Sequence, residues 1–302
     1  MTPERTVSLS FLGKKEKQET AVVYQEIANP FNGGAVAFAI FNGEHIAIKR
    51  SKVPGGAQHE AVGLRKVIAA GIPTTPLIGL AEEEDGTIVL VTSKLSGNNL
   101  FTEREPMLRE ELGRMVGSMH REIPVTGTIW RSSEYANTSN LLSKVTPRLE
   151  SIDSTSLRQK SASLLNQLIE AVHERIPEIS PSFLHGDIHN GQVLLLDNGP
   201  LALIDFEAWT EGDSVRDIAM YVFHTLRTRQ PREDIEAFLK GYLTGRAFSE
   251  EEKGSLSLYA LIIGIGSVSY YKVMMKNQYK YALDYLNRVV DYIQSGELGS
   301  AY

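Results

Sequence analysis

The first third of the chain is dominated by short runs of apolar residues that suit β-strands. The run Ala35–Phe41 is small and apolar, and after Asn42-Gly43 apolar residues return at Ile46 and Ile48. Asn-Gly between two such runs is a strong signal for a two-residue hairpin turn. The pattern therefore predicts a β-hairpin, with Lys49 on the face opposite to the two isoleucines.

One helix and one further strand are expected after this hairpin. The stretch Gln58–Ala70 has apolar residues at helical spacing and is followed by Gly71 and Pro73, which end helices. Ile88–Val91 is apolar throughout and leads into the polar connector Thr92–Gly97. The N-terminal part is thus predicted to be an antiparallel sheet with one helix.

Beyond residue 100 the apolar positions recur at helical spacing. The stretch Glu103–Glu122 has one apolar stripe, and residues 141–179 contain two helical patterns separated near Ser154. Four further apolar helices are expected at roughly 214–229, 232–244, 249–275 and 277–295. The chain as a whole is predicted to be an α+β protein whose second part is mainly helical.

Two acids flank a short hairpin in this second part. Val193–Leu196 and Leu201–Ile204 are apolar, and the residues 197–200 between them are turn formers. Asp187 precedes the first strand and Asp205 ends the second, so a hairpin would bring their carboxylates to the same end. Such a pair can form a dyad, hold a hard metal ion, or divide the roles of base and metal ligand. Two solvated loop acids are the simpler alternative.

The residues around these acids favour a catalytic pair over two solvated loop acids. His185-Gly186-Asp187, the polar Gln192 and Asp205-Phe206-Glu207 follow the order of the catalytic parts of kinases. In that template the first Asp accepts the proton of the acceptor hydroxyl, the residue five positions later holds metal, and the last Asp holds Mg²⁺.

From residue 183 to 221 the chain resembles the aminoglycoside phosphotransferase and choline kinase-like superfamily of small-molecule kinases. The HGD loop, the IDFE strand end, Gly212-Asp213 and Asp217 carry this resemblance. It implies a bilobal protein-kinase-like fold, with an N-terminal nucleotide-binding lobe at 1–95 and a C-terminal catalytic and substrate-binding lobe at 96–302. It also implies Mg²⁺ as cofactor and ATP or GTP as phosphoryl donor.

The resemblance implies a role for individual residues. Asp187 is expected to be the catalytic base, Asp205 the principal Mg²⁺ ligand, and Gln192 a second ligand through its amide oxygen. Lys49 is expected to contact the nucleotide phosphates and to pair with Glu60 of the predicted helix. A surface lysine and a glutamate that favours the helix dipole are the simpler alternatives.

Two backbone segments are expected to bind the nucleotide. Gly33 and Gly34 occupy the place of the phosphate-covering loop, where glycine lets backbone N–H groups approach closely. This loop is not a G-x-G-x-x-G motif, so an ordinary turn is the alternative. Ser93 and Leu95 lie in the connector that matches the hinge, where backbone groups would meet the base.

Gln192 departs from the family pattern, which usually has Asn at this position. The additional methylene displaces the amide oxygen by about 1 Å. Asn190, two residues earlier, is therefore a second candidate for the metal ligand.

Composition narrows the possible partners and compartment. The 302 residues include no cysteine, which excludes disulfides and thiolate metal sites, and the net charge of −6 argues against nucleic acid. The N-terminus lacks the apolar core of a signal peptide. The most apolar run, Leu256–Tyr271, is shorter than the about 20 residues that span a bilayer. A cytoplasmic protein with no membrane partner is expected, and no signal for an oligomeric state is present.

The expected acceptor is a small hydroxylated molecule. Asp217 follows Asp205 by only twelve positions, which leaves no space for the long activation segment of protein kinases. By the resemblance, an antibiotic such as an aminoglycoside or macrolide is favoured over an amino alcohol or sugar. A nucleotide-binding pseudokinase with little turnover is the alternative, because Gln192 and the glycine loop are atypical.

Overall fold

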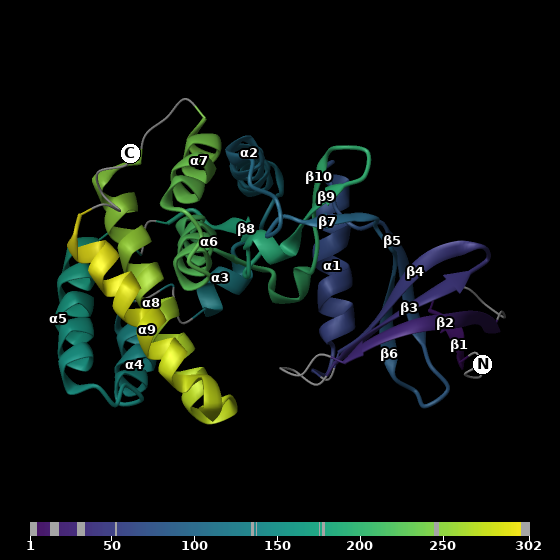
Figure 1. Cartoon of the computed structure of the whole chain (residues 1–302), viewed down its shortest axis with the longest axis horizontal. Helices are drawn as coiled ribbons and strands as arrows, with labels where there is room; N and C mark the ends of the chain where they lie inside the picture. The colour runs from purple at the N-terminus through teal and green to yellow at the C-terminus, as the bar shows by residue number, and fades with distance from the viewer. Residues whose placement is uncertain are drawn as a thin grey trace. The chain divides into compact units, whose positions relative to one another are not determined.

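The computed structural model divides the chain into two compact units (Figure 1). It describes residues 5–12, 18–28, 34–51, 53–133, 136, 138–174, 176, 179–244 and 248–296. Unit 1 comprises Met1–Glu103 with Gly191–Trp209, and unit 2 comprises Arg104–Asn190 with Thr210–Tyr302. The fold class is α+β, with an antiparallel sheet in the N-terminal region, and the boundary expected after residue 95 remains a prediction.

Unit 1 contains a closed antiparallel barrel with the strand order β1-β2-β3-β4-β6-β5. Its strands are β1 (Arg5–Phe11), β2 (Gln18–Ala28), β3 (Ala35–Phe41), β4 (Glu44–Arg50), β5 (Leu77–Glu82) and β6 (Ile88–Ser93). Pairing of Ser10 with Glu82 and of Phe11 with Ala81 joins β1 to β5 and closes the sheet. Closure leaves no open sheet edge.

The predicted hairpin of β3 and β4 is confirmed. Asn42 and Gly43 both have positive φ, at 51° and 84°, as a type I′ turn requires. Ile46 and Ile48 are buried in the barrel core, whereas Lys49 lines a cavity on the other face. Alternation along β4 therefore presents an ammonium group to the outside of the barrel.

A helix and a small second sheet complete unit 1. Helix α1 (Gly56–Ala69), expected from the sequence, packs against β5 and β6 (Figure 1). The predicted hairpin forms as β9 (Val193–Leu196) and β10 (Leu201–Leu203). The unpredicted strand β7 (Gly97–Asn99) pairs with β9, which gives the order β10-β9-β7.

Unit 2 is mainly helical. Its helices are α2 (Pro106–Glu122), α3 (Thr128–Ser132), α4 (Thr138–Leu149), α5 (Thr155–Val172), α6 (Val215–Arg227), α7 (Arg232–Leu243), α8 (Glu250–Met274) and α9 (Tyr279–Gln294). Short strands β8 (Ser182–Leu184) and β11 (Thr210–Gly212) pair with each other. The predicted break near Ser154 is confirmed, because its hydroxyl accepts the N–H of Leu157 and caps α5.

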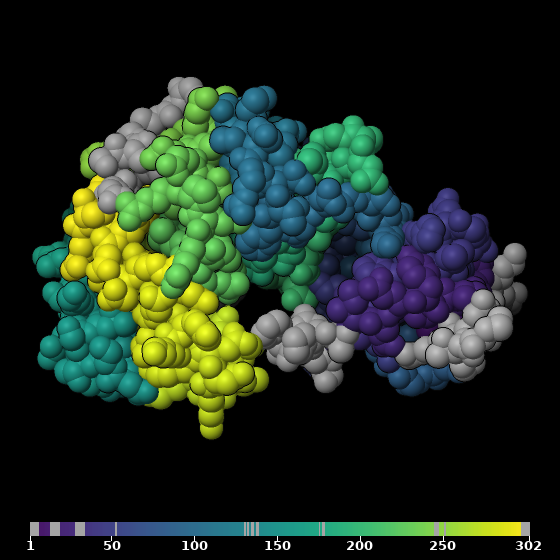
Figure 2. Space-filling view, viewed as in Figure 1, coloured from purple at the N-terminus to yellow at the C-terminus, as the bar shows by residue number. Residues whose placement is uncertain are grey.

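Helix α8 lies in the core of unit 2. Its contacts with α4, α5, α6 and α9 bury Leu258, Leu261, Ile265 and Val268. In the space-filling view α9 (yellow) lies on the surface of this unit beside teal atoms of the α4–α5 segment, and α9 is in contact with α5 (Figure 2). Within the described residues, Glu252–Met274 is long and apolar enough to cross a membrane, and half of its most apolar stretch is buried inside the protein.

Candidate functional site

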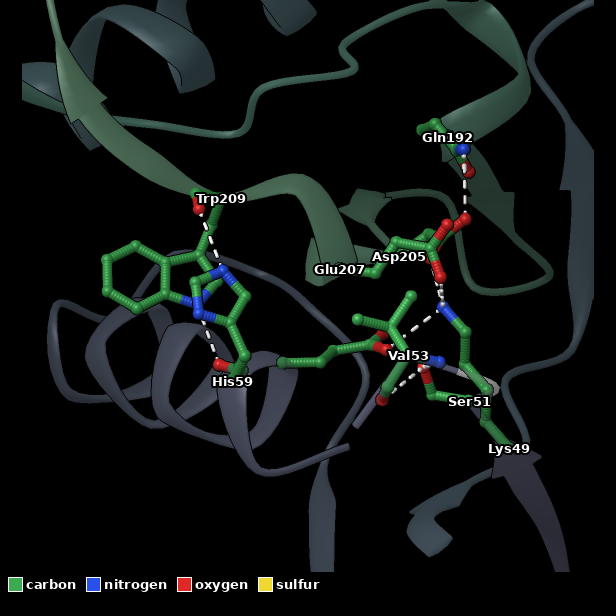
Figure 3. A network of polar contacts seen from close by, with 9 residues as sticks. Lys49, Ser51, Val53, His59, Gln192, Asp205, Glu207 and Trp209 are labelled. Carbon is green, nitrogen blue, oxygen red and sulfur yellow. Dashed lines mark hydrogen bonds and ion pairs between the residues drawn. The ribbon is translucent and has the colours of Figure 1, made fainter. Parts of the chain in front are cut away.

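Lys49 forms ion pairs with three carboxylates in unit 1, and Figure 3 labels two of these acids, Asp205 and Glu207. Its Nζ lies 2.9 Å from Glu60 Oε2 and 3.0 Å from Glu207 Oε2. The same ammonium donates a hydrogen bond to Asp205 Oδ1. Because Lys49 and Glu60 are both largely buried, these charges interact more strongly than a pair on the surface would. The structure thus joins Lys49 to Glu60, as expected from their places in strand and helix, and adds two further acids.

The charges of this cluster depend on one another. Burial alone would lower the pKa of Lys49, but Glu60, Asp205 and Glu207 raise it above its ordinary value and keep the ammonium charged. Burial raises the pKa of Glu60 to about 7, against the opposing effect of Lys49. One cation among three acids leaves an excess of negative charge, which favours the binding of a further cation.

Asp205 has an uncommon backbone conformation at the end of β10. Its φ of 67° and ψ of 65° lie in the left-handed region, which residues other than glycine rarely adopt. Such conformations persist where the surrounding structure imposes them, and they are concentrated at functional sites. Gln192 contributes to this surrounding structure, because its Nε2 donates to Asp205 Oδ2 at 3.0 Å (Figure 3).

The oxygen atoms of the cluster suit a hard divalent cation. One carboxylate oxygen from each of Glu60, Asp205 and Glu207 lies within 4.8 Å of the other two. Carboxylate and amide oxygens are the ligands that Mg²⁺ prefers in proteins. Gln192 directs its amide nitrogen at Asp205, so the amide group would have to turn over to offer its oxygen to the same ion.

A cavity of about 420 Å³ adjoins the cluster within unit 1. Its apolar lining comprises Ile27, Val36, Phe38, Ala47, Leu64, Leu90, Leu194 and Ile204. Lys49, Glu60, Gln192 and Asp205 also line it, so it combines an apolar wall with a charged part. Its size and lining are typical of small-molecule and cofactor sites.

The two connector residues expected near the base both line this cavity. The N–H of Ser93 is already bonded to Pro76 O at 2.9 Å. The N–H of Leu95 has no partner among the described residues, so it is available to a ligand. Of the glycine pair, Gly34 is buried directly before β3, and Gly33 lies outside the described residues.

His59, to which the sequence assigned no role, fixes Trp209 beside α1. The two rings are stacked with centroids 4.7 Å apart. Trp209 Nε1 donates to His59 O at 2.7 Å, and a His59 Nε2 to Trp209 O contact of 2.9 Å accompanies it (Figure 3). These contacts hold the segment 205–209, which carries Asp205 and Glu207, against α1, the helix that carries Glu60.

In unit 2 the His185–Asp187 loop is fixed by a buried aspartate. Asp217 accepts the backbone N–H groups of His185 at 2.7 Å and Gly186 at 2.9 Å. His120 Nε2 lies 3.1 Å from the same carboxylate. Burial would raise the pKa of Asp217, but the hydrogen bonds and charge of its partners lower it below the ordinary value. Asp217 is therefore an ionised support of the loop, and nearby Asp213 accepts the N–H of Val215 at 3.1 Å.

Asp187 lies between two histidines. His224 Nε2 of α6 is 3.4 Å from its Oδ1, and His189 Nε2 is 3.8 Å from its Oδ2. Burial would raise the pKa of Asp187, but the hydrogen bond with His224 lowers it below its ordinary value, so this carboxylate is ionised at neutral pH. Burial also lowers the pKa of His189 to about 3 and that of His224 below its ordinary value. The loop thus presents a carboxylate flanked by two uncharged imidazoles.

Asn190, the second candidate for a metal ligand, is also in unit 2. Its Nδ2 donates a hydrogen bond to Gln230 Oε1. The residue is almost fully buried. Gln192 is the one of the two that contacts Asp205 within unit 1, and the choice between them as a metal ligand remains a prediction.

Glu207 and His224 were not singled out from the sequence. Glu207 belongs to the IDFE motif, so its place two residues after Asp205 was a usable signal. His224 lies seven residues after Asp217, which is two helical turns and puts both on one face of α6. That spacing was a usable signal that His224, like Asp217, contacts the His185–Asp187 loop.

A model of the phosphotransferase enzyme family matches residues 53–252 of the chain. No curated protein sequence matches it significantly. Among solved structures, spectinomycin phosphotransferase with ADP and spectinomycin is 15% identical at a TM-score of 0.60, with 92% of this chain and 93% of that one covered. Aminoglycoside 2'-phosphotransferase-IIIa with GDP is 13% identical at a TM-score of 0.66, with 90% and 94% covered.

A third similar structure is a thermostable mutant of an aminoglycoside phosphotransferase, in ternary complex with AMP-PNP and hygromycin B. It is 15% identical at a TM-score of 0.62, with 97% of this chain and 95% of that one covered. At these identities the likeness to solved structures concerns the fold.

Proposed function

The chain belongs to the phosphotransferase enzyme family, and from this premise we propose that it moves the γ-phosphoryl group of ATP or GTP to a hydroxyl of a small molecule. The observation that carries the proposal is the cluster of Lys49, Glu60 and Asp205 beside an apolar cavity. Family membership supports a phosphotransferase that acts on small molecules, and the donor, metal and acceptor below are our proposals.

The nucleotide base would occupy the cavity of unit 1. Apolar side chains such as Val36 and Leu194 would cover its faces, and the N–H of Leu95 would donate to its edge. Lys49 would contact the phosphates, while Glu60 keeps the ammonium in place. The buried backbone at Gly34, with Gly33, would lie near the phosphates because glycine leaves room for them.

Asp205 and Gln192 would hold Mg²⁺, with Glu207 as a further carboxylate nearby. The bound ion supplies positive charge that neutralises the phosphate oxygens. Lys49 and the ion would compete for Asp205, so metal binding would weaken the contact of Lys49 with Asp205. Release of that contact would leave Lys49 paired with Glu60 and free to turn to the phosphates.

Asp187 would orient the acceptor hydroxyl and accept its proton during transfer. A base must be ionised to do this, and the neighbouring histidines favour the ionised form of Asp187. Asp217 would keep the loop in its conformation through the N–H groups of His185 and Gly186. Positioning of this kind accounts for a large part of catalysis in phosphoryl transfer.

We propose an antibiotic, an aminoglycoside or a macrolide, as the acceptor class. Similar structures contain spectinomycin or hygromycin B, which supports a small hydroxylated substrate. A metabolic amino alcohol or sugar is the alternative within the same reaction class. We further propose that the protein acts in the cytoplasm without a nucleic-acid or membrane partner, as its net charge of −6 favours.

The test is a panel of candidate acceptors incubated with γ-labelled ATP or GTP, with and without Mg²⁺. We expect label transfer to at least one hydroxylated acceptor, dependent on Mg²⁺ and lost in Asp187→Asn. Absence of transfer to every acceptor, combined with tight nucleotide binding, would instead support a pseudokinase.

One observation favours a nucleotide-binding pseudokinase as a second candidate function. Gln192 directs an amide nitrogen at Asp205, while Lys49 occupies the other oxygen of that carboxylate. A protein that never binds the metal could retain this arrangement. Such a protein would bind nucleotide equally well with Mg²⁺ and with a chelator.

A further inference from the structure

Asp187, His189 and His224 form a compact cluster of potential metal ligands in unit 2. One ligand atom of each lies within 4.8 Å of the other two. The two imidazole rings are stacked with centroids 4.3 Å apart, and their Nε2 atoms lie 3.8 Å and 3.4 Å from different oxygens of Asp187. The proposed transfer reaction needs the carboxylate and assigns the imidazoles no direct contact with the nucleotide.

The donor set of this cluster differs from that around Lys49. Two imidazole nitrogens and one carboxylate oxygen suit Zn²⁺ and related transition ions, whereas Mg²⁺ prefers oxygen ligands alone. An imidazole must be uncharged to bind a metal.

The ligand atoms of this cluster lie near one another, and a rearrangement of the rings would be needed to form a tetrahedral zinc site. With ligand bonds of about 2.1 Å, neighbouring ligand atoms of a tetrahedral site are about 3.4 Å apart. The two measured separations, 3.4 Å for His224 and 3.8 Å for His189, involve different oxygens of Asp187. With a single oxygen of Asp187 all three separations are below 4.8 Å, and the stacked rings have to turn before both nitrogens point at one ion. Three protein ligands with one position left to water is the usual form of an accessible zinc site.

We propose that Asp187, His189 and His224 bind Zn²⁺ or a similar transition ion, and that this ion inhibits phosphoryl transfer by occupying the carboxylate that accepts the proton. The binding site stands on the geometry of unit 2 alone. Only the inhibition rests on the proposed function, because it assumes that Asp187 is the base.

The outer contacts of His224 limit the expected affinity. Its Nδ1 is buried without a hydrogen-bond partner among the described residues. Metal-bound histidines normally donate this second N–H, and loss of such a contact costs about 10- to 100-fold in affinity. We therefore expect reversible binding that a chelator removes, as suits an inhibitory ion.

The first experiment measures metal binding without any assay of activity. The full-length protein is titrated with Zn²⁺ in competition with a chromophoric chelator, in excess Mg²⁺. We expect one equivalent to bind to the wild type, and at least a tenfold loss of affinity in His224→Asn and in His189→Asn. The matched control is His173→Asn, because His173 is an exposed histidine of the same unit, 4.0 Å from Glu174. Equal affinity in all four proteins would overturn the site.

A second measurement keeps the test valid if a cluster variant does not fold. Imidazole NMR signals of the wild type are followed during the titration, with Co²⁺ as a spectroscopic probe of coordination. Perturbation of His189 and His224 with His173 unchanged supports the site. Perturbation of surface histidines alone overturns it.

A third experiment measures activity and distinguishes this site from the Mg²⁺ site. It also shows whether a failure concerns the site or the proposed function. Zn²⁺ is added to the transfer assay at saturating Mg²⁺, and Asp205→Asn is tested for Zn²⁺ binding. Inhibition that EDTA followed by Mg²⁺ reverses, with binding retained in Asp205→Asn, supports the proposal. Loss of Zn²⁺ binding in Asp205→Asn assigns the ion to the other cluster and overturns it. If no acceptor is ever phosphorylated, the proposed function fails, whereas the binding experiments still decide the site.

Discussion

Asp205 forms hydrogen bonds with both Lys49 and Gln192, and 30% of its side chain is exposed to solvent. Because it is only partly buried, we expect Asp205→Asn to fold normally while losing the charge that holds the metal. Loss of a catalytic electrostatic contact typically lowers kcat by about 10²-fold or more. The measurement is kcat for label transfer at saturating Mg²⁺. The control is Asp197→Asn in the exposed turn of the same hairpin, and a variant at position 205 that keeps more than a tenth of the activity would remove Asp205 from the metal site.

Gln192 allows a graded test of the second metal ligand. If its oxygen binds the ion, Gln192→Asn should keep most of the activity with a changed Mg²⁺ dependence, whereas Gln192→Ala should lose about 10²-fold, since positioning dominates this chemistry. The measurement is kcat against Mg²⁺ concentration for the three forms. A pseudokinase predicts an inactive wild type that Gln192→Asn restores. A fully active Ala variant would assign the role to solvent or to Asn190.

At the residue scale, the sequence predicted those parts of the site whose position follows from local pattern. Lys49 was expected on the strand face opposite to Ile46 and Ile48, because it alternates with them, and the structure places it on that face, where it lines a cavity. Glu207 was missed as a partner of Lys49 because the two residues meet through the tertiary fold, where Glu207 follows the left-handed backbone at Asp205. A tertiary contact of this kind has no signature in local periodicity.

Helix α1 and the segment that follows β10 are joined through a small residue. A Cβ added at Gly63 would lie 2.5 Å from Trp209 Cδ1, so only glycine lets the indole pack on the helix. We expect Gly63→Ala to displace Trp209 and to destabilise unit 1 by about 1–3 kcal/mol, as overpacking does. The displaced segment carries Asp205 and Glu207, so the Mg²⁺ concentration for half-maximal activity should rise too.

The measurement for Gly63→Ala is urea unfolding together with an Mg²⁺ titration of activity. Val62→Ala is the matched control, since Val62 is exposed on the same helix and contributes little packing. If Gly63→Ala is as stable and as active as this control, the contact between α1 and Trp209 does not position the acids.

At the element scale, most elements were predictable because their signals are local. The Asn42-Gly43 turn and the serine cap at Ser154 fix boundaries that the structure confirms. Strand β7 was missed because its three residues form a strand only by pairing with β9, almost a hundred residues away. Closure of the barrel through β1 and β5 depends in the same way on partners distant in sequence.

At the scale of the whole chain, the composition of the units was not readable from the sequence. The segment 191–209 belongs with the N-terminal residues because β9 pairs with β7 and Trp209 packs on α1. This long-range pairing gives unit 1 the two residues Asp205 and Gln192 that were expected to bind metal. The buried acid Glu60 of that unit is expected to make its folding stability depend on pH.

Glu60 should make the stability of unit 1 depend on pH between about 4.5 and 7. Its pKa rises from the ordinary 4.5 to about 7 in the folded state, mainly through burial. In this window the unfolded chain has released the proton and the folded chain retains it, so raising the pH favours unfolding. Integrated over the window, the loss amounts to about 3 kcal/mol, and it is complete above the folded pKa. Lys49 does not oppose it, because the raised pKa of Lys49 acts only at alkaline pH.

The measurement is urea unfolding from pH 4.5 to 7.5 with EDTA present, followed by the fluorescence of Trp209 in a Trp130→Phe background. Local detection is needed because two units need not unfold together. The free energy of unfolding of the wild type should fall with pH relative to Glu60→Gln, which has no proton to lose. Glu44→Gln, an exposed change on β4, should show the same pH slope as the wild type. Parallel slopes for wild type and Glu60→Gln would mean that Glu60 is already ionised at pH 4.5, and that Lys49 outweighs burial in the folded protein.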